Sequence, residues 1–319
     1  MIGSVLTTEG AFSLLAERHR RELHVHCYRM LGSFDEAEDL VQETLLRAWR
    51  RRDSLESGER FRAWLYKIAT NACLDAIKRS GRRVPSLGSF RDIPWLQPYP
   101  DRLLAELDPI AKEPDETVVG RETIELTFLA VIQLLSPRQR AVLILRDVLD
   151  WPANEVANFL EIGVAAVNSA LQRARATLHE QLPPDRREDW AKPETSEKEK
   201  ELLQLFIDSH ERGDTEAAIA LISADIRITM PPLPYLYEGR DSVAELIARA
   251  FGEESLGTWR LVPIWANRHP AAASYLRAPG DGTFRAFKID VLRVVDGRIA
   301  EITTFDTALF EAFGLPRTL

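Results

Sequence analysis

The stretch ANEVANFLEIGVAAVNSALQRARATL, residues 153–178, has the pattern of two short helices joined by a tight turn. Apolar side chains on the second helix recur at intervals of three and four residues, which predicts one buried stripe. The stripe consists of Val164, Val167, Leu171, Ala174 and Leu178. On the first helix, Ala157 is small enough for two helices to cross closely. This spacing, with a turn at 161–163, is typical of a helix-turn-helix.

The other side of the second helix carries small, hydrogen-bonding and cationic groups and no Asp or Glu. The major groove of DNA admits one helix, and its phosphates attract Arg and repel carboxylates. The pattern therefore favours DNA binding over an ordinary amphipathic helix, which stays open as the alternative. Glu161 departs from the motif, because Gly commonly occupies that turn position to supply a positive φ.

Charge is distributed unevenly along the 319 residues, whose net charge is −8. Residues 44–91 hold twelve Lys and Arg against four Asp and Glu, whereas residues 92–125 hold three against nine. The net charge argues against nucleic-acid binding, but a basic block of this kind allows phosphate binding on one face.

Bulk features exclude several other classes. Apolar runs are too short for a membrane span, and the N-terminus has no signal-peptide pattern, so a cytoplasmic protein without membrane partners is predicted. Cys27 and Cys73 lack CxxC spacing and are predicted to be buried thiols, with a redox pair as the alternative. The six histidines show no zinc-ligand spacing, so neither a metal nor a cofactor is predicted.

Helical periodicity fills residues 10–80 and 121–179, and the segment between them is rich in Gly, Pro and Ser, as linkers are. A second, charged linker follows. From about residue 198, helical patterns give way to strand patterns separated by Asp-Gly pairs, which indicates an α+β domain with antiparallel strands.

Three motifs in register carry a resemblance to a known family. YRMLGSFDEAEDLVQETLLRAWRR and RFRAWLYKIATNACLDAIKR resemble the N-terminal module of extracytoplasmic-function (ECF) RNA polymerase sigma factors. LLSPRQRAVLILRDVLDWPANEVANFLEIGVAAVNSALQRARATL resembles their C-terminal promoter-binding module. The resemblance implies a region 2 helical bundle that binds core polymerase and the −10 element. It also implies a region 4 helix-turn-helix that binds the −35 element.

Site residues follow from that resemblance. It implies that the β′ clamp helices of polymerase bind three residues on one side of a helix, Asp39, Gln42 and Glu43. The alternative is that these residues form a solvated acidic face. It also implies a contact with the β flap of polymerase. The residues that it implies at the −10 element are Lys67, Asn71, Lys78, Arg79, Arg82 and Arg83. The set facing the −35 element is Asn168, Ser169, Gln172, Arg173 and Arg175, with Arg138 and Arg140 as further phosphate contacts.

Residues 198–319 resemble a SnoaL-like domain of the NTF2-like superfamily, through MPPLPYLYEGRDSVAELIARAF, WRLVPIWANRHPAAASYLR and DGRIAEITTF. A subset of ECF sigma factors carries such a domain together with a Trp-Leu-Pro-like linker signature. Trp95, Leu96 and Pro98 resemble that signature, although Gln97 interrupts it. The resemblance implies that the domain docks on the sigma modules and the linker and modulates activity. It leaves a small-molecule ligand open.

We therefore predict a multidomain chain: two all-α modules followed by an α+β NTF2-like cone. The expected segments are region 2, a linker, region 4, a charged linker and the regulatory domain, at residues 1–92, 93–120, 121–183, 184–197 and 198–319. The predicted function is promoter-specific transcription initiation with core RNA polymerase. A one-component helix-turn-helix regulator with a small-molecule-sensing domain is the alternative.

A third hypothesis is an enzyme with a nucleic-acid-binding extension. It requires a general base and an oxyanion donor in the cone. The candidates are Asp290, His269, Tyr235 and Tyr237. No spacing links them, and strand alternation leaves open whether Asp290 points into the cone or into solvent. The prediction is therefore that the chain is not an enzyme.

Overall fold

The computed structural model describes residues 9–55, 61–82, 84, 90–105, 124–182, 197–252 and 255–319. The chain divides into two units. The N-terminal unit comprises Met1–Leu87 and Ala105–Trp190, and the C-terminal unit comprises Gly88–Leu104 and Ala191–Leu319. The segment between the two helical parts of the N-terminal unit thus belongs to the C-terminal unit.

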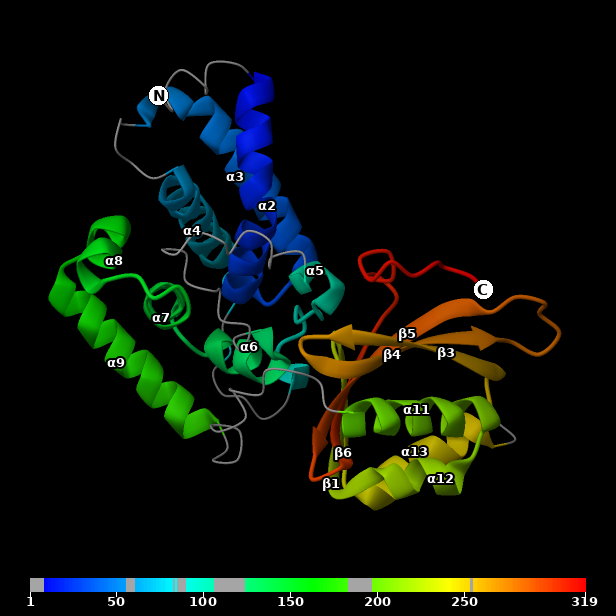
Figure 1. Cartoon of the computed structure of the whole chain (residues 1–319). Helices are drawn as coiled ribbons and strands as arrows, with labels where there is room; N and C mark the ends of the chain where they lie inside the picture. Colours follow the sequence, from blue (N-terminus) through cyan, green and yellow to red (C-terminus); the bar gives the residue numbers. More distant parts are fainter. Residues whose placement is uncertain are drawn as a thin grey trace. The chain divides into compact units, whose positions relative to one another are not determined.

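Helices alone make up the described part of the N-terminal unit (Figure 1). They are α2 (Glu9–Leu31), α3 (Phe34–Arg50), η1 (Arg52–Ser54), α4 (Phe61–Ser80), α6 (Leu126–Gln133), α7 (Pro137–Leu143), the π-helical η4 (Ile144–Val148), α8 (Ala153–Leu160) and α9 (Val164–Gln181).

Local sequence signals explain several helix starts. Ser33 caps α3 by accepting the N–H of Glu36, and Asp35 and Glu36 lie in its first turn, where carboxylates suit the helix dipole. Ser136 and Gln139 form a capping box at the start of α7, with Pro137 at its first position. Cys27 and Cys73 are both buried, as predicted.

The C-terminal unit combines helices with one sheet (Figure 1). Its elements are η2 (Phe90–Asp92), α5 (Asp101–Ala105), α11 (Glu197–Arg212), α12 (Thr215–Leu221), β1 (Ile222–Met230), β2 (Leu233–Glu238), α13 (Arg240–Phe251), β3 (Thr258–Ala266), β4 (His269–Arg277), β5 (Arg285–Val295) and β6 (Arg298–Phe305).

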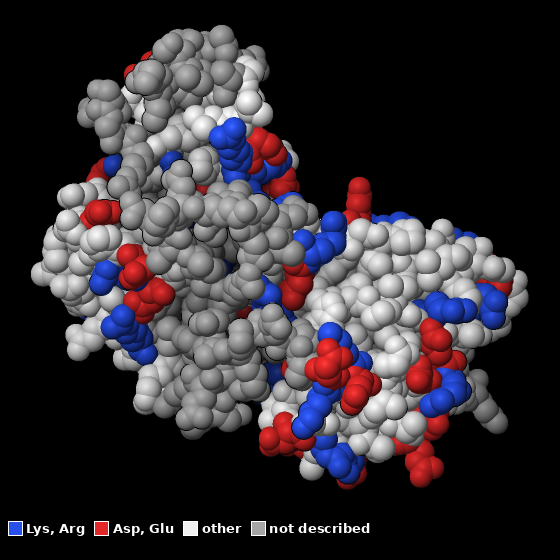
Figure 2. Space-filling view, viewed as in Figure 1, with Lys and Arg blue, Asp and Glu red and all other residues white. Residues whose placement is uncertain are grey.

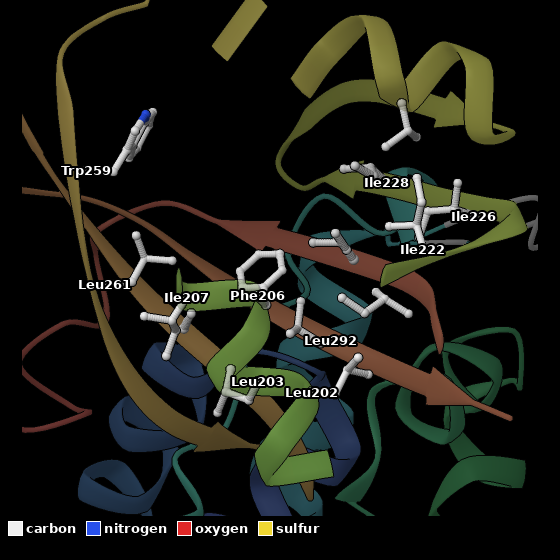
Figure 3. Close-up of a cluster of buried hydrophobic side chains, with 14 residues drawn as sticks. Leu202, Leu203, Phe206, Ile207, Ile222, Ile226, Ile228, Trp259, Leu261 and Leu292 are labelled. Carbon is white, nitrogen blue, oxygen red and sulfur yellow. The ribbon is translucent and has the colours of Figure 1, made fainter. Parts of the chain in front are cut away.

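The six strands have the order β2-β1-β6-β5-β4-β3. Side chains of α11 pack on the sheet and form a buried cluster with residues of β1, β3 and β5 (Figure 3). Phe206 and Ile207 of α11 meet Leu261 of β3 and Leu292 of β5 in this cluster. This one-sided apolar packing of helix on sheet agrees with the predicted α+β domain.

Two details of the sheet differ from the prediction. The strand β2 was not predicted. It contains Pro234 and lies at the sheet edge, where a missing N–H is tolerated. The pair β1 and β6 is parallel, whereas antiparallel strands were expected. These strands are the first and last of the sheet in sequence, so no hairpin constrains their direction.

No helix within the described ranges is both long and apolar enough to cross a lipid bilayer.

Candidate functional site

The predicted helix-turn-helix is formed by α8 and α9. Glu161 ends α8 in the left-handed region, with φ 55° and ψ 45°, and Ile162 N–H donates to the carbonyl of Ala157 at 3.0 Å. Glu161 therefore adopts the conformation for which Gly is usual. Gly163 precedes α9 with an extended backbone and no side-chain cap.

The buried stripe of α9 is largely as predicted. Val167, Leu171, Ala174 and Leu178 are buried. The inclusion of Val164 was wrong, since it is 44% exposed at the first turn of the helix, and Ala170 is buried instead. The helix begins at Val164, so its first side chain extends beyond the surface that α8 covers.

Replacing Glu161 with Gly is expected to stabilise the N-terminal unit by about 1 kcal/mol, because Gly adopts a positive φ without the Cβ penalty. The carboxylate lies 3.6 Å from Lys67 Nζ, but both side chains are exposed, so losing this pair costs little. Urea denaturation measures the effect. Glu161→Ala is the control, since it removes the carboxylate and keeps the strain. Equal stability of the two variants would contradict the strain argument.

The polar face of α9 is open to solvent. Asn168, Gln172 and Arg173 are exposed, and the Arg173 guanidinium donates to Ser169 Oγ at 2.8 Å. Arg175 is held by two hydrogen bonds to the carboxylate of Asp147, at 2.8 and 2.7 Å. This carboxylate raises the pKa of Arg175. A phosphate at Arg175 would have to compete with Asp147.

The acidic face of α3 is also accessible. Asp39 and Gln42 are exposed, whereas Glu43 is half-buried and pairs with Arg47 at 2.6 Å. Gln42 donates to Glu38 at 3.4 Å. Asp39 makes no hydrogen bond or ion pair with another described residue. The spacing of Asp39, Gln42 and Glu43 brings them to one side of the helix.

The basic residues of α4 form a second polar face. Lys67, Asn71 and Lys78 are separated by four and seven residues and so share one helical side. Asn71, Lys78 and Arg79 are exposed. Arg82, which follows α4, forms two contacts with the Glu36 carboxylate, one of them at 2.7 Å. Arg83 lies outside the described residues.

The prediction that Arg140 contacts phosphate was wrong. Its guanidinium is buried and donates to Ile132 O at 2.9 Å, Gln133 Oε1 at 2.7 Å and other acceptors. These are the carbonyls of Met30, Gln133 and Leu135. Burial lowers the pKa of Arg140 to about 9, so it stays charged at neutral pH. Arg138 lies two positions earlier, on a different side of α7, and is exposed.

Within the N-terminal unit, the helical part that contains the helix-turn-helix (α6 to α9) contacts the first helical part (α2 to α4). The Trp151 ring lies against Tyr66 of α4, with ring centroids 5.8 Å apart, and against Phe159 of α8 at 5.1 Å. The Lys67–Glu161 ion pair and the Arg140–Met30 hydrogen bond join the same two parts. The sequence showed no sign of these contacts, since each partner comes from a distant segment.

In the C-terminal unit, residues 90–104 are held by hydrogen bonds that involve both backbone and side-chain atoms. Tyr99 N–H donates to Asn267 Oδ1 at 2.7 Å, and Asn267 N–H donates to Tyr99 O at 3.0 Å. Leu96 and Pro98 are buried and Trp95 is half-buried. The Arg102 guanidinium donates twice to the carbonyl of Ala312. The linker segment is thus docked on the turn between β3 and β4 and on the chain after β6.

Linker docking is expected to weaken as pH rises from about 4 to about 6. Burial raises the pKa of Asp101 to about 6, although its Oδ1 accepts Arg268 N–H at 3.0 Å. The docked state therefore binds this proton more tightly than the unfolded state, whose pKa is near 3.8. The stabilisation that protonated Asp101 provides is complete below about pH 3.8, and it is lost once the pH rises above about 6.

The comparison with Asp101→Asn isolates this effect. Urea unfolding of the C-terminal unit between pH 4 and pH 7 should show a pH-dependent loss of stability that the variant lacks. An identical pH profile for the two proteins would rule out a contribution from Asp101.

A cavity of about 720 Å³ lies in the C-terminal unit. Asp290 points into it: its side chain is buried, Oδ1 accepts the Thr304 hydroxyl at 2.7 Å, and Oδ2 lies 2.9 Å from Lys288 Nζ. Tyr235 and Tyr237 also line the cavity, whereas His269 does not. The structure thus brings together three of the four candidates named from the sequence.

Sequence reasoning missed His210, Lys288 and Thr304, which also line this cavity. Two signals could have found them. Lys288 and Asp290 alternate on one strand and so share a face, and Thr304 lies opposite Asp290 in the β5–β6 register. His210 Nδ1 lies 2.8 Å from the Phe206 carbonyl, and burial lowers its pKa to about 4, so the ring is neutral at pH 7.

Three known protein families match successive parts of the chain. The Sigma-70 region 2 family matches residues 15–83, the Sigma-70, region 4 family matches residues 125–178, and the SnoaL-like domain family matches residues 203–302. The chain is 41% identical to the ECF RNA polymerase sigma factor SigG of Mycobacterium tuberculosis, over 97% of this chain and 85% of that protein. The chain belongs to the ECF RNA polymerase sigma factors.

One further relative supports the family by its sequence and the fold by its structure. The ECF RNA polymerase sigma factor SigJ of Mycobacterium tuberculosis is 26% identical over 90% of this chain and 88% of its own length. Its crystal structure matches with a TM-score of 0.62 at 21% identity, covering 96% of this chain and 99% of that one. This ECF sigma factor is therefore a polymerase-binding, promoter-directing protein with two helical sigma regions and an NTF2-like C-terminal domain. It does not belong to an enzyme family.

Proposed function

We propose that this ECF sigma factor binds the β′ clamp helices of core RNA polymerase through Asp39, Gln42 and Glu43, and the β flap through its region 4. The −10 element contacts Lys67, Asn71, Lys78 and Arg79 of α4, together with Arg82 and Arg83, which follow α4 in the sequence. Exposure of Asp39 and Gln42 on α3 and of Asn71, Lys78 and Arg79 on α4 supports the assignment.

The −35 element is read by α9. Asn168, Ser169, Gln172 and Arg173 reach base edges, and Arg175 exchanges Asp147 for phosphate. The absence of carboxylates from the α9 segment that carries these residues supports this role, because acids there would repel phosphate. The proposal keeps the predicted segments, with the DNA-binding modules at residues 1–92 and 121–183, and a cytoplasmic site of action.

Reversing the charge at Asp39 is expected to weaken core polymerase binding by about tenfold or more, because Asp39 is exposed and has no partner within the described residues to mask it. The measurement is the affinity of Asp39→Arg for core enzyme, with thermal unfolding as a folding check. Asp53→Arg is the control, since Asp53 is an exposed acid outside α3. Unchanged affinity of Asp39→Arg would remove α3 from the interface.

The C-terminal unit regulates these activities through the linker. The reciprocal hydrogen bonds between Tyr99 and Asn267 are the observation that carries this proposal. The docked segment lies in sequence between the two DNA-binding modules, so docking shortens the chain available for separating them. Modules that must bind two promoter elements at once depend on that separation.

Run-off transcription with core polymerase tests the proposal. The full chain should initiate at a specific promoter, and a chain lacking residues 198–319 should initiate at a different rate. Initiation on no promoter would exclude the proposed promoter contacts. Equal rates for the two chains would make the C-terminal unit a passenger.

We also propose that a small molecule can bind the C-terminal unit. The volume of the cavity supports this, because ligand pockets in proteins commonly enclose about 300–1,000 Å³.

A further inference from the structure

The walls of the cavity are mostly apolar. Side chains from α11, α13 and five strands line it, among them Phe206, Ile228, Met230, Leu246, Trp259 and Ile302. Several apolar lining residues are exposed at the surface of the unit: Leu233 and Tyr235 at 52%, Leu256 at 57% and Phe287 at 39%. Figure 2 shows a broad uncharged area on the face of the C-terminal unit seen there, bordered by interspersed Lys, Arg, Asp and Glu.

Charges in the cavity lining balance. Lys288 and Arg249 are matched by Asp290 and Asp306, and His210 is neutral because burial lowers its pKa to about 4. An ionic ligand would lose its hydration without meeting a net opposite charge. A neutral ligand avoids that cost.

Two buried polar atoms in the lining retain hydrogen-bonding capacity. Asp290 Oδ2 is buried and pairs with Lys288 Nζ at 2.9 Å, and because a carboxylate oxygen has two lone pairs it can accept a further hydrogen bond. Trp259 Nε1 is likewise buried with no acceptor among the described residues. Unsatisfied buried polar atoms are costly, and a bound group that pairs with them removes that cost.

We infer that this cavity binds a neutral, largely apolar molecule that carries a hydroxyl group. The hydroxyl donates to Asp290 Oδ2 and accepts from Lys288 Nζ, since a hydroxyl is both donor and acceptor. The apolar body packs among the lining side chains of α11, α13 and the strands. This inference rests on the proposal that the C-terminal unit is the regulatory part, and it names the ligand class that acts there.

The cavity and the docked linker share structural elements. Strands β1 and β2 provide Ile228, Met230 and Tyr237 to the lining, and the linker segment η2 packs against the same two strands. The strand β2 is at the sheet edge, with only β1 as a strand neighbour. A ligand that fills the cavity fixes the side chains of β1 and β2, so its binding alters linker docking.

The test uses the full chain and three matched probes: 1-naphthol, naphthalene and 1-naphthoate. The expected result is that 1-naphthol binds at least about tenfold more tightly than the other two, which corresponds to one hydrogen-bonded group of about 1.4 kcal/mol. In Asp290→Asn the preference for 1-naphthol over naphthalene should fall below about threefold, because the amide no longer offers two acceptor oxygens. Equal binding of the three probes would overturn the inferred ligand class.

A second pair of variants does not depend on the buried carboxylate. Leu233→Arg places a charge at the mouth of the cavity, whereas Leu205→Arg does so on α11 outside the lining at the same 52% exposure. Only Leu233→Arg should weaken naphthalene and 1-naphthol binding, by about tenfold. Equal effects of the two variants would overturn the location of the site.

Hydrogen exchange at the amides of Tyr99 and Asn267 reports linker docking with and without saturating 1-naphthol. A change of at least about threefold in their exchange rates is expected, and unchanged rates would overturn the coupling. None of these measurements involves polymerase. Probe binding by a chain whose C-terminal unit has no effect in run-off transcription would contradict the proposed function and leave the site standing.

Discussion

Asn267→Ala is expected to release the linker from the C-terminal unit and to speed amide exchange at Tyr99 by about 100-fold or more. Asn267 is fully buried, and its Oδ1 accepts the Tyr99 N–H at 2.7 Å. Removing this acceptor leaves a buried donor unsatisfied, which costs about 1–3 kcal/mol. Asn267 also has a φ of 53°, where Asn is tolerated and Ala costs about 1 kcal/mol more.

The consequence for transcription follows from the place of the linker in the chain. If docking restrains the two DNA-binding modules, Asn267→Ala should change the run-off rate in the same direction as deletion of residues 198–319. Asn267→Gly separates the two contributions, since Gly removes the acceptor and tolerates the positive φ. Tyr99 exchange as slow in Asn267→Ala as in the wild type would show that this pair does not hold the linker.

Arg140→Met is expected to destabilise the N-terminal unit by about 3–5 kcal/mol, the range for losing a buried hydrogen-bonded charge network. Five acceptors depend on the guanidinium, and four of them are backbone carbonyls. Met fills a comparable volume but donates no hydrogen bond, so these acceptors are left buried and unsatisfied. Because Met30 belongs to α2, the contact between the two helical parts also weakens.

Hydrogen exchange on peptides from α2, α6 and α7 measures this loss without assuming that the two units unfold together. Arg138→Met is the matched control, because Arg138 is exposed in the same helix and its replacement should change stability by less than about 0.5 kcal/mol. Similar exchange in the two variants would contradict the structural role of Arg140.

Local patterns predicted much of the fold. The spacing of Val167, Leu171 and Ala174 identified the buried side of α9, and the capping box of Ser136 and Gln139 is a local signal of the same kind at the start of α7. Such patterns are reliable because helix periodicity and capping involve residues within a few positions of one another. The family resemblance, carried by motifs in register, predicted both sigma regions and the SnoaL-like domain, and the comparisons confirmed them.

The candidate site was predicted less completely. Arg138 and Arg140 are equivalent as cations in the sequence, yet one is exposed and the other is buried beneath carbonyls. Glu161 counted against the helix-turn-helix in the sequence, but its backbone adopts the conformation that the turn requires. A residue type predicts a conformational preference, and the surrounding packing can override it.

The sequence by itself determined the helices, the stripe of α9, the strand-rich end of the chain and the membership of the family, because each depends on short-range periodicity or on motif order. Only the tertiary structure decided where Arg140 finds its acceptors, where the linker docks and which way Asp290 points. Met30 lies 110 positions from Arg140, and Asn267 lies 168 positions from Tyr99. Strand alternation gives Asp290 two faces, and packing of the sheet against α11 selects the one that becomes the interior.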